Sequence, residues 1–400
     1  MKPMGVLTLA ILLCPTTLFG QQRITIRAGT LLDGKGGIAR NTTLVIEGSQ
    51  IVRIDPAIQT VTYDLSRLTV MPGWIDTHTH LVSHFNRENG RAQAGANETP
   101  QQAMLYAAEN AYETLMAGFT TVQSPGAAID KDLRDWIATG PLPGPRILTS
   151  LGSIQSGSPG EIRAAVRKYV ADGADVIKIF ATKSIREGGG QTLSDEQVQA
   201  ACGEAKALGK RAIVHAQGPE GAKAAVLAGC TSIEHGYRLT DEVLDLMAQR
   251  STFYDPHFGL LLHNYLENKA RYLGIGNFDE AGFDYMEKGI PIGIETFRRA
   301  LAKKVKIVFG TDAGAGAHGR NYEEFIYRVR DGGQPPMEAI IAATSRAAES
   351  LNMQDQIGSL APGMQADIVA TDGNPLDDIA TVRRVVFVMR GGKVFKNLAK

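Results

Sequence analysis

Four histidines and one aspartate each follow a short apolar run, and their side chains are all metal-ligand types. They are His78, His80, His215, His235 and Asp312. Residues two apart on a strand point to the same face, so His78 and His80 project the same way. The chain has only eight histidines, and half of them fall in this pattern. The pattern predicts a divalent-metal site, although the His-x-His pair alone is also typical of histidines satisfied within a loop.

Lys178 lies inside the apolar run VIKIF, residues 176–180, where a charged amine is costly to bury. A nearby metal would lower the pKa of this amine, and the neutral amine could react with carbon dioxide to give a carbamate. A carbamate offers two hard oxygens that can bridge two cations. The alternative is a lysine paired with a carboxylate, such as Asp175 or a neighbour from another strand. Beside the histidines and Asp312, we favour the carbamate.

These six side chains are more than one four-coordinate zinc needs, so we expect two divalent metals per chain. Zinc suits nitrogen and oxygen ligands in a hydrolytic site, and manganese or cobalt would also fit. Two such ions can share a bridging hydroxide and polarise a carbonyl group. Asp312 is placed to take the proton from that water and pass it to a leaving amine. This chemistry predicts the hydrolysis of an amide bond.

The elements that must position these side chains alternate between strands and helices. Apolar runs recur eight times, with helical patterns between them such as residues 158–171 and residues 193–208, the latter capped by Ser194. Eight such units favour an α/β fold, a (β/α)8 TIM barrel, whose active site forms at the C-terminal ends of the strands. Residues 83–100 and 264–283 have loop-like patterns and are candidate lids.

Both ends of the chain are rich in short strands. Residues 21–72 alternate apolar and polar side chains between glycine turns, and residues 358–400 repeat this pattern. We therefore expect one small β-sandwich accessory domain built from both chain ends. The catalytic barrel then spans residues 73–357.

Composition and the first residues bear on partners and location. Lys plus Arg and Asp plus Glu number 42 each, so the net charge of zero gives no support for a nucleic-acid or anionic-membrane partner. Residues 1–20 combine Lys2, a short apolar run and Gly20, which is typical of a signal peptide. The run is too short to span a bilayer comfortably. We expect a secreted or periplasmic protein with no membrane segment in its mature form.

Cys202 and Cys230 are the cysteines that remain after such a signal peptide is removed. Two cysteines cannot form a disulfide scaffold, although one bridge is conceivable in an oxidising compartment. Cys202 lies in an alanine-rich helical pattern and Cys230 in a turn before a strand. We favour core packing for both.

Several motifs resemble those of the amidohydrolase superfamily, and within it the metal-dependent, prolidase-like dipeptidases related to imidazolonepropionase. The motifs are MPGWIDTHTH (71–80), GADVIKIFAT (173–182), VHA (214–216), IEHG (233–236), GTDAG (310–314), AHG (317–319) and GSLAPGMQAD (358–367). They span nearly the whole mature chain in the expected order. The resemblance implies an Xaa-Pro or Xaa-amino-acid dipeptidase type of hydrolase, often assembled as a homo-oligomer, with one accessory domain formed by the β-rich ends.

The resemblance also implies a ligand set. His78, His80 and Asp312 would bind one metal, His215 and His235 the other, and carboxylated Lys178 (N6-carboxylysine) would lie between them. One motif departs from the family pattern. Relatives carry a Gly-Gly-His loop after the third strand, where this chain has GSIQSGS, residues 152–158, so a substrate-binding histidine is absent.

The leading function is hydrolysis of a peptide or N-acyl-amino-acid bond, as in a dipeptidase or carboxypeptidase. Such a substrate carries a free carboxylate, and Tyr237, Arg238 and His318 are the candidates to bind it. The alternatives are that Tyr237 packs against the rim, Arg238 is solvated and His318 braces a loop. Hydrolysis of another amide, a cyclic amide, a lactone or a phosphoester, aromatic N-acyl amino acid toxins included, stays open. A non-catalytic scaffold is remote, because such relatives lose ligands that this chain keeps.

Overall fold

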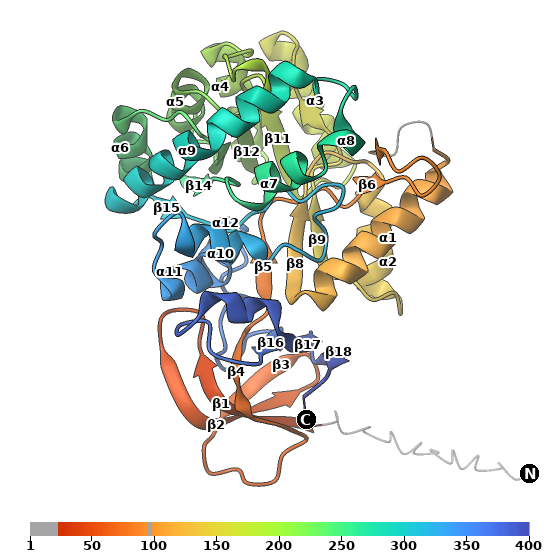
Figure 1. Cartoon of the computed structure of the whole chain (residues 1–400), viewed down its shortest axis with the longest axis vertical. Coiled ribbons are helices and arrows are strands. Elements are labelled where there is room, and N and C mark those ends of the chain that lie inside the picture. The colour runs from red at the N-terminus through yellow and green to blue at the C-terminus, as the bar shows by residue number, and fades with distance from the viewer. Residues whose placement is uncertain (1–22, 94–97, 400) are drawn as a thin grey trace, which may run out of the picture.

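The computed structural model describes residues 23–93 and 98–399. The predicted signal peptide, residues 1–20, lies outside these described residues and stays a prediction. Within them the chain forms a β-sheet at one end of the molecule and a larger region of alternating strands and helices at the other (Figure 1). The predicted mixed α/β fold is confirmed.

Strands from both ends of the chain form one seven-stranded sheet in the order β18-β17-β16-β4-β1-β2-β3. The strands are β1 (Arg23–Leu32), β2 (Ile38–Glu47), β3 (Gln50–Ile54), β4 (Tyr63–Pro72), β16 (Ile368–Thr371), β17 (Val385–Arg390) and β18 (Lys393–Asn397). The structure corrects the predicted sandwich in one respect: β4 pairs with β1 on one edge and with β16 on the other, so the segments make a single hydrogen-bonded sheet. They lie together at the bottom of Figure 1.

Asp367, the last residue of the GSLAPGMQAD motif, ties this sheet to the rest of the molecule. One carboxylate oxygen accepts a 2.7 Å hydrogen bond from the Gly391 amide, and the other lies 2.8 Å from Nη1 of Arg146. The backbone carbonyl of Asp367 accepts from the Gly73 amide at 2.8 Å. Because Gly73 immediately precedes the first strand of the larger region, the backbone and side chain of buried Asp367 together connect the sheet to the start of that region.

The larger region contains two parallel sheets, one of three strands and one of six. The first sheet holds β5 (Trp74–Asp76), β8 (Phe119–Ser124) and β9 (Arg146–Thr149). The second holds β10 (Ser153–Ile154), β11 (Val176–Phe180), β12 (Arg211–Ala216), β13 (Ser232–His235), β14 (Phe253–Asp255) and β15 (Lys306–Ile307). Within each of these two sheets, the strands pair in the order in which they follow one another along the chain, which is the order that repeated βα units produce.

Backbone hydrogen bonds also link the two parallel sheets to each other. On one side the Asp175 amide donates to the Thr149 carbonyl at 2.8 Å. On the other side the Thr77 amide donates to the Phe309 carbonyl at 2.8 Å, and Thr79 forms an isolated parallel bridge with Ala313. The backbone around His78 is therefore in direct contact with the backbone around Asp312.

Helices follow most of these strands. They are α1 (Pro100–Met116), α2 (Asp130–Thr139), α3 (Pro159–Ala171), α4 (Asp195–Ala207), α5 (Pro219–Leu227), α6 (Asp241–Arg250), α7 (Leu260–Glu267), α8 (Lys269–Tyr272), α9 (Glu280–Ala302), α10 (Glu323–Arg330), α11 (Pro336–Ala342) and α12 (Ser345–Ser350), with short 3-10 helices η1 (Ile185–Glu187) and η2 (Ile379–Arg383). Ser194 caps α4 as predicted, because its side chain accepts from the Gln197 amide.

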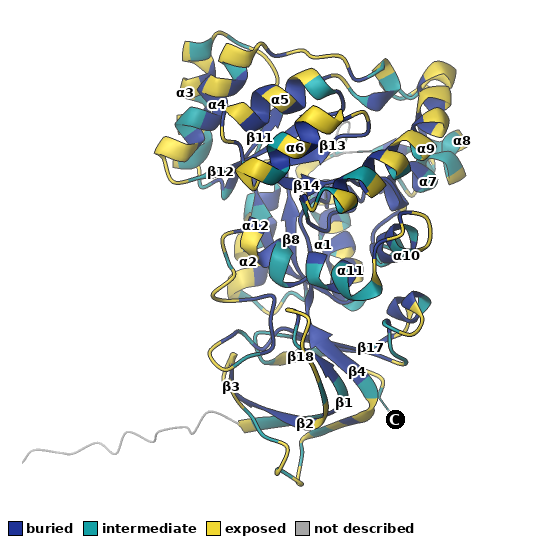
Figure 2. Ribbon diagram, turned by 90° about the vertical axis from the view of Figure 1, so that its left-hand side faces the viewer, coloured by how far each residue is buried: buried dark blue, intermediate teal, exposed yellow. Residues whose placement is uncertain are grey.

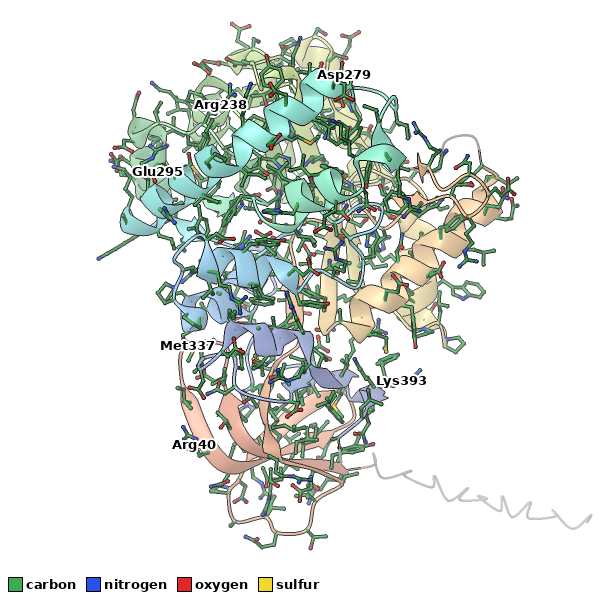
Figure 3. The ribbon with its side chains drawn as sticks, viewed as in Figure 1. Arg40, Arg238, Asp279, Glu295, Met337 and Lys393 are labelled. Atoms are coloured by element: carbon green, nitrogen blue, oxygen red, sulfur yellow. A yellow bond between two sulfur atoms is a disulfide. The ribbon has the colours of Figure 1, made fainter. Side chains whose placement is uncertain are left out.

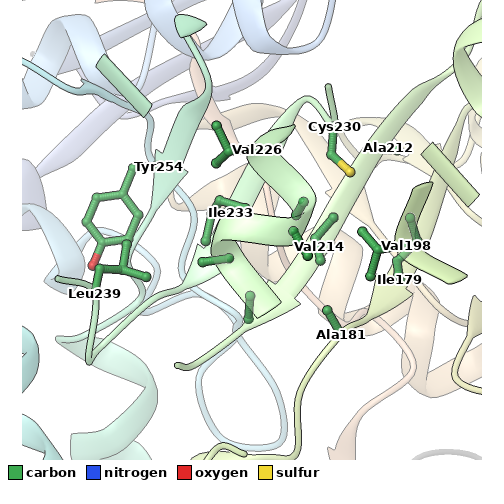
Figure 4. Packing of buried hydrophobic residues seen from close by; sticks show 14 of the residues in the cluster. Ile179, Ala181, Val198, Ala212, Val214, Val226, Cys230, Ile233, Leu239 and Tyr254 are labelled. Atoms are coloured by element: carbon green, nitrogen blue, oxygen red, sulfur yellow. The ribbon is translucent and has the colours of Figure 1, made fainter. Parts of the chain in front are cut away.

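The strands of the larger region are buried beneath these helices (Figure 2). Val214 of β12 and Ile233 of β13 are both fully buried and belong to one apolar cluster (Figure 4). A strand that is buried on both faces has a continuous run of apolar residues, and such runs allow these strands to be predicted from the sequence. Val226 on the covering helix α5 completes this layer.

The two candidate lids contain more regular structure than their sequences suggest. In residues 83–100, β6 (His84–Phe85) and β7 (Ala92–Gln93) form a small antiparallel hairpin. In residues 264–283, the end of α7 and the whole of α8 are helical, so the prediction of a loop there is wrong for these residues. Both helices are short and pack through tertiary contacts that a local pattern does not display.

Cys202 and Cys230, for which the sequence favours core packing and leaves one bridge open, form a disulfide. Cys202 lies on α4 and Cys230 lies just before β13, with their Cα atoms 5.3 Å apart. Both are nonetheless buried in the main apolar cluster. The bond joins two successive βα units across β12.

None of the helices in the described residues is both long and apolar enough to cross a membrane.

Candidate metal centre

The predicted ligands converge on one cavity of about 530 Å³ at the C-terminal ends of the parallel strands. All six line it: His78, His80, Lys178, His215, His235 and Asp312. The His78 and His80 ring centroids are 5.3 Å apart, and those of His215 and His235 are 4.5 Å apart. The position of these residues at strand ends thus places them where parallel-strand folds build active sites.

Asp312 belongs to two groups of side chains, each of which is spaced to hold a cation. In one group His78, His80 and Asp312 each offer a ligand atom, and these atoms lie within 4.8 Å of one another. In the other, His235, His257 and Asp312 meet the same limit. Oδ1 of Asp312 is 2.9 Å from Nε2 of His80 and 3.7 Å from Nε2 of His78. One carboxylate can therefore contribute to both groups.

Lys178 and His215 lie beside these groups. Nζ of Lys178 is 3.2 Å from Nε2 of His78. The His215 ring packs against that of His235. Its Nε2 lies 3.2 Å from the Lys183 carbonyl oxygen. Among the described histidines, cysteines and acids, His215 belongs to none of the groups that are spaced to hold a metal ion. The geometry brings His215 into the cavity and directs one ring nitrogen toward its wall.

The buried imidazoles fit a bound divalent cation, because they are held in the neutral form that binds metals. Burial, then the charge of Lys178, lowers the pKa of His78 well below its ordinary value, and the same causes lower that of His215 to about 3. Burial followed by His215 lowers the pKa of His235 in the same way. Burial also lowers the pKa of the Lys178 amine, outweighing the opposing attraction of Glu234 and Asp312. Neutral nitrogen donors beside an ionised carboxylate match zinc chemistry.

Asp312 supplies that ionised carboxylate. Burial alone would raise its pKa, but the hydrogen bond and charge of His80 outweigh burial and lower the pKa to about 2. The Asp312 amide donates to the His78 carbonyl at 2.7 Å, which aligns the two turns. Asp312, His235 and His257 all have left-handed backbones, with φ of 51°, 68° and 46°. Non-glycine residues persist there only where surrounding structure holds them, and such residues gather at functional sites.

Sequence reasoning missed a layer of charged residues behind the ligands. Nδ1 of His78 lies 2.6 Å from Oε2 of Glu234, and Nε2 of His257 lies 3.1 Å from Oδ1 of Asp255. Burial would lower the pKa of His257, but attraction to Asp255 prevails and raises it to about 9. Buried Arg328 lies 3.5 Å from Asp255. Asp255 ends β14 and His257 follows two residues later, so the strand-end rule, extended to the seventh apolar run, would have found these two residues of the layer.

Asp76 holds the turn that carries Asp312. Its carboxylate accepts from the Thr311 hydroxyl at 2.6 Å, from the Thr311 amide at 3.0 Å and from Nδ2 of Asn321 at 2.7 Å. It also accepts from the His78 amide at 3.1 Å. Asp76 thereby couples the first strand to the turn after the eighth apolar run.

The three predicted substrate-binding residues separate in the structure. Tyr237 lines the cavity, but its buried hydroxyl donates to the His257 carbonyl at 2.7 Å. Arg238 is exposed and does not line the cavity (Figure 3), and its Nη1 lies 3.3 Å from the Gly188 carbonyl. His318 lies outside it too, with Nε2 3.1 Å from the His80 carbonyl and 3.2 Å from that of Ser83. Of these three residues, Tyr237 lines the cavity, and Arg238 and His318 do not.

Comparison with known proteins agrees with this geometry. The amidohydrolase family model matches residues 69–395. Ochratoxinase from Aspergillus niger is 27% identical, covering 93% of this chain and 86% of that protein. Imidazolonepropionase from Fusobacterium nucleatum is 25% identical, covering 84% and 86%. The solved structure of a Xaa-Pro dipeptidase with methionine bound in its active site is 34% identical with a TM-score of 0.86, covering 94% of this chain and 100% of that one. The chain belongs to the amidohydrolase family and is a hydrolase that acts on carbon–nitrogen bonds.

Proposed function

We propose that this protein is a binuclear metal-dependent hydrolase that cleaves the amide bond of a dipeptide or an N-acyl amino acid. The observation that carries this proposal is that the Asp312 carboxylate lies within metal-binding distance of two groups of histidines at one cavity. Similarity to a Xaa-Pro dipeptidase and to ochratoxinase supports amide substrates. Similarity to imidazolonepropionase keeps cyclic amides as the second candidate.

The scaffold in this proposal is one closed (β/α)8 barrel. Its third strand would consist of β9 and β10, which are separated by only a few residues. The hydrogen bonds from Asp175 to Thr149 and from Thr77 to Phe309 support closure, because they continue the strand order across both gaps between the parallel sheets. Closure would surround the cavity with strand ends on every side.

We assign His78, His80 and Asp312 to one metal and His215 and His235 to the other, with Lys178 as a carbamate between them. His257, not His215, is the histidine that lies within metal-binding distance of His235 and Asp312, but Asp255 keeps it protonated, and a protonated imidazole has no lone pair for a metal. We therefore give His257 a positioning role. Bound zinc would lower the pKa of water and polarise the scissile carbonyl.

Asp312 acts in this proposal as the proton carrier. Its carboxylate is ionised at neutral pH and faces the cavity, so it can accept a proton from the attacking water. The same group then delivers the proton to the leaving nitrogen, which an amide requires. His80 orients the carboxylate through the 2.9 Å contact with Oδ1.

The proposed site makes a direct prediction about metal content. Purified protein reconstituted with zinc should contain two metal ions per chain by elemental analysis. The paired variant His78→Ala/His80→Ala should retain fewer ions, whereas the control His263→Ala, on α7 and outside the cavity, should retain both. One ion or none in the reconstituted wild-type protein would contradict the binuclear assignment.

The function itself is tested by a substrate library. Metal-reconstituted protein should release amino acids from dipeptides or N-acyl amino acids, detected by mass spectrometry. Lactones, phosphoesters and cyclic amides belong in the same screen as competing classes. Turnover restricted to one of these classes, with no dipeptide or N-acyl amino acid cleaved, would replace the proposed substrate class.

Export and homo-oligomer formation complete the proposal. The Cys202–Cys230 disulfide supports an oxidising compartment. Leu105 on α1 and Trp136 on the neighbouring α2 are 71% and 65% exposed, and such apolar side chains are typical of contact surfaces. Light scattering of the mature protein measures its oligomeric state directly.

A further inference from the structure

Arg186 is a cation at the cavity wall that the proposed chemistry does not use. It lies on η1, which follows β11 and packs against α9. Its side chain lines the cavity that holds the predicted metal ligands. It also lines a second cavity of about 510 Å³, and His80 is shared between the two in the same way. Arg186 thus lies where a molecule reaching from the metal ligands into the second cavity would pass.

The guanidinium of Arg186 is held in place by Asn277, Phe278 and Tyr265. Its Nε donates a 2.6 Å hydrogen bond to Oδ1 of Asn277. Its Cζ lies 4.0 Å from the centroid of the Phe278 ring, a stacking distance for a cation on an aromatic face. The hydrogen bond to Asn277 uses the Nε edge of the planar group, and the contact with Phe278 uses one of its faces. The outer edge, formed by the two Nη atoms, is the part suited to bind a carboxylate in bidentate fashion.

Arg186 forms no ion pair with any carboxylate in the described part of the chain. The nearby Glu187 accepts instead from Nδ2 of Asn277 at 2.8 Å, on the far side of the same amide. By contrast, Arg134 and Arg320 have carboxylates within 3.0 Å. A half-buried, oriented arginine without an internal anion is arranged to receive one from a ligand.

The second cavity has an aromatic wall. The ring centroids of Tyr265 and Tyr272 are 4.9 Å apart, and Phe278 lies 5.0 Å and 4.8 Å from them. Ile275 adds an aliphatic side chain. The Tyr272 hydroxyl donates to the Ala315 carbonyl at 2.7 Å, so its polar end already has a hydrogen-bond partner in the protein backbone. This wall and volume suit a large apolar or aromatic side chain.

We propose that Arg186 binds the carboxylate of the substrate and that the cavity beside it, formed by Tyr265, Tyr272, Ile275 and Phe278, takes that residue's side chain. The substrate class is then an N-acyl amino acid or dipeptide whose carboxylate-bearing residue is aromatic or large and apolar. This inference rests on the proposed function, because it places the scissile amide at the metal ligands. Phenylalanine and leucine are preferred over alanine and glycine at this position.

The test compares N-acetyl-L-phenylalanine, its carboxamide and N-acetyl-L-alanine, with acetate release as the measurement. Arg186→Met should lower kcat/KM for the phenylalanine acid by about tenfold to a hundredfold, the worth of a charge-assisted pair, and leave the carboxamide unchanged. Methionine retains contact with the Phe278 ring, which protects the fold. Arg163→Met, at an exposed arginine of α3 that lines neither cavity, is the matched control and should affect neither substrate.

A second variant tests the side-chain cavity separately. Ile275→Trp fills it and should reverse the preference of the wild type for phenylalanine over alanine. Equal losses on acid and carboxamide in Arg186→Met would overturn the carboxylate assignment. An unchanged preference in Ile275→Trp would overturn the cavity assignment.

A binding measurement separates this inference from the proposed function. Calorimetry of the metal-loaded protein should show that free L-phenylalanine binds more tightly than L-phenylalaninamide or L-alanine, and that Arg186→Met removes this difference. If no amide is hydrolysed but this binding pattern holds, the proposed function fails and the inference stands. If amides are hydrolysed but the product amino acid binds no better than its amide, the inference fails alone.

Discussion

Replacing Asp312 by asparagine is expected to lower kcat by about 10²–10⁴-fold, the usual contribution of a general acid–base group. The amide can keep the contact with His80, but it cannot accept and return a proton. The fold should persist because asparagine tolerates the left-handed backbone that Asp312 adopts, with φ of 51°. The measurements are kcat, the unfolding temperature and the metal content of the same preparation.

The matched control is Asp331→Asn, the same chemical change at an exposed position after α10. It should leave kcat and metal content unchanged. At least one metal should remain in Asp312→Asn, since the histidines are untouched. A loss of only a few fold in Asp312→Asn, with metal content intact, would show that another group carries the proton.

Replacing Lys178 by alanine is expected to reduce kcat/KM by more than about a hundredfold. Even the outer partners of metal ligands are worth about 10–100-fold, and the proposed carbamate contacts both metals directly. The amine is buried, its Nζ is 3.2 Å from Nε2 of His78, and burial lowers its pKa, which favours the neutral form that reacts with carbon dioxide. Activity and metal content after reconstitution, with and without added bicarbonate, measure the effect.

Small carboxylic acids distinguish a carbamate from a structural lysine. Acetate or propionate should partly restore activity to Lys178→Ala, because the shortened side chain leaves room for a carboxylate. Lys178→Met fills the same space and should not be restored by either acid. Lys206→Ala, at an exposed position of α4 outside the cavity, should stay active without additives. Near wild-type activity in Lys178→Ala would return Lys178 to the carboxylate-paired alternative.

The convergence of the predicted ligands could be read from the sequence because it depends on a local rule. Each of His78, His215 and His235 follows an apolar run, and the C-terminal ends of parallel strands meet at one face. The rule needs only that the strands pair in chain order, which they do. Tyr237 could be placed for the same reason, since it comes two residues after His235.

Features that depend on distant packing could not be read in this way. Arg186 reaches the cavity because η1 packs against α9, about a hundred residues later, and Asn277 and Phe278 hold its side chain. The pairing of β4 with β16 joins opposite ends of the chain and merges two β-rich segments into one sheet. Alternating apolar residues identify strands but do not say which edges meet.

The disulfide between Cys202 and Cys230 makes a covalent ring of the chain segment between them, and that ring contains β12 with His215. For a ring closed across a sequence separation of 28, the loss of freedom in the unfolded chain stabilises the fold by about 3.5 kcal/mol. The ring ends just before β13, which presents His235 to His215. Reduction of two sulfur atoms, far from any reacting bond, would remove this stabilisation from the part of the fold that presents both imidazoles. The unfolding temperature of the reduced protein should accordingly be lower than that of the oxidised chain.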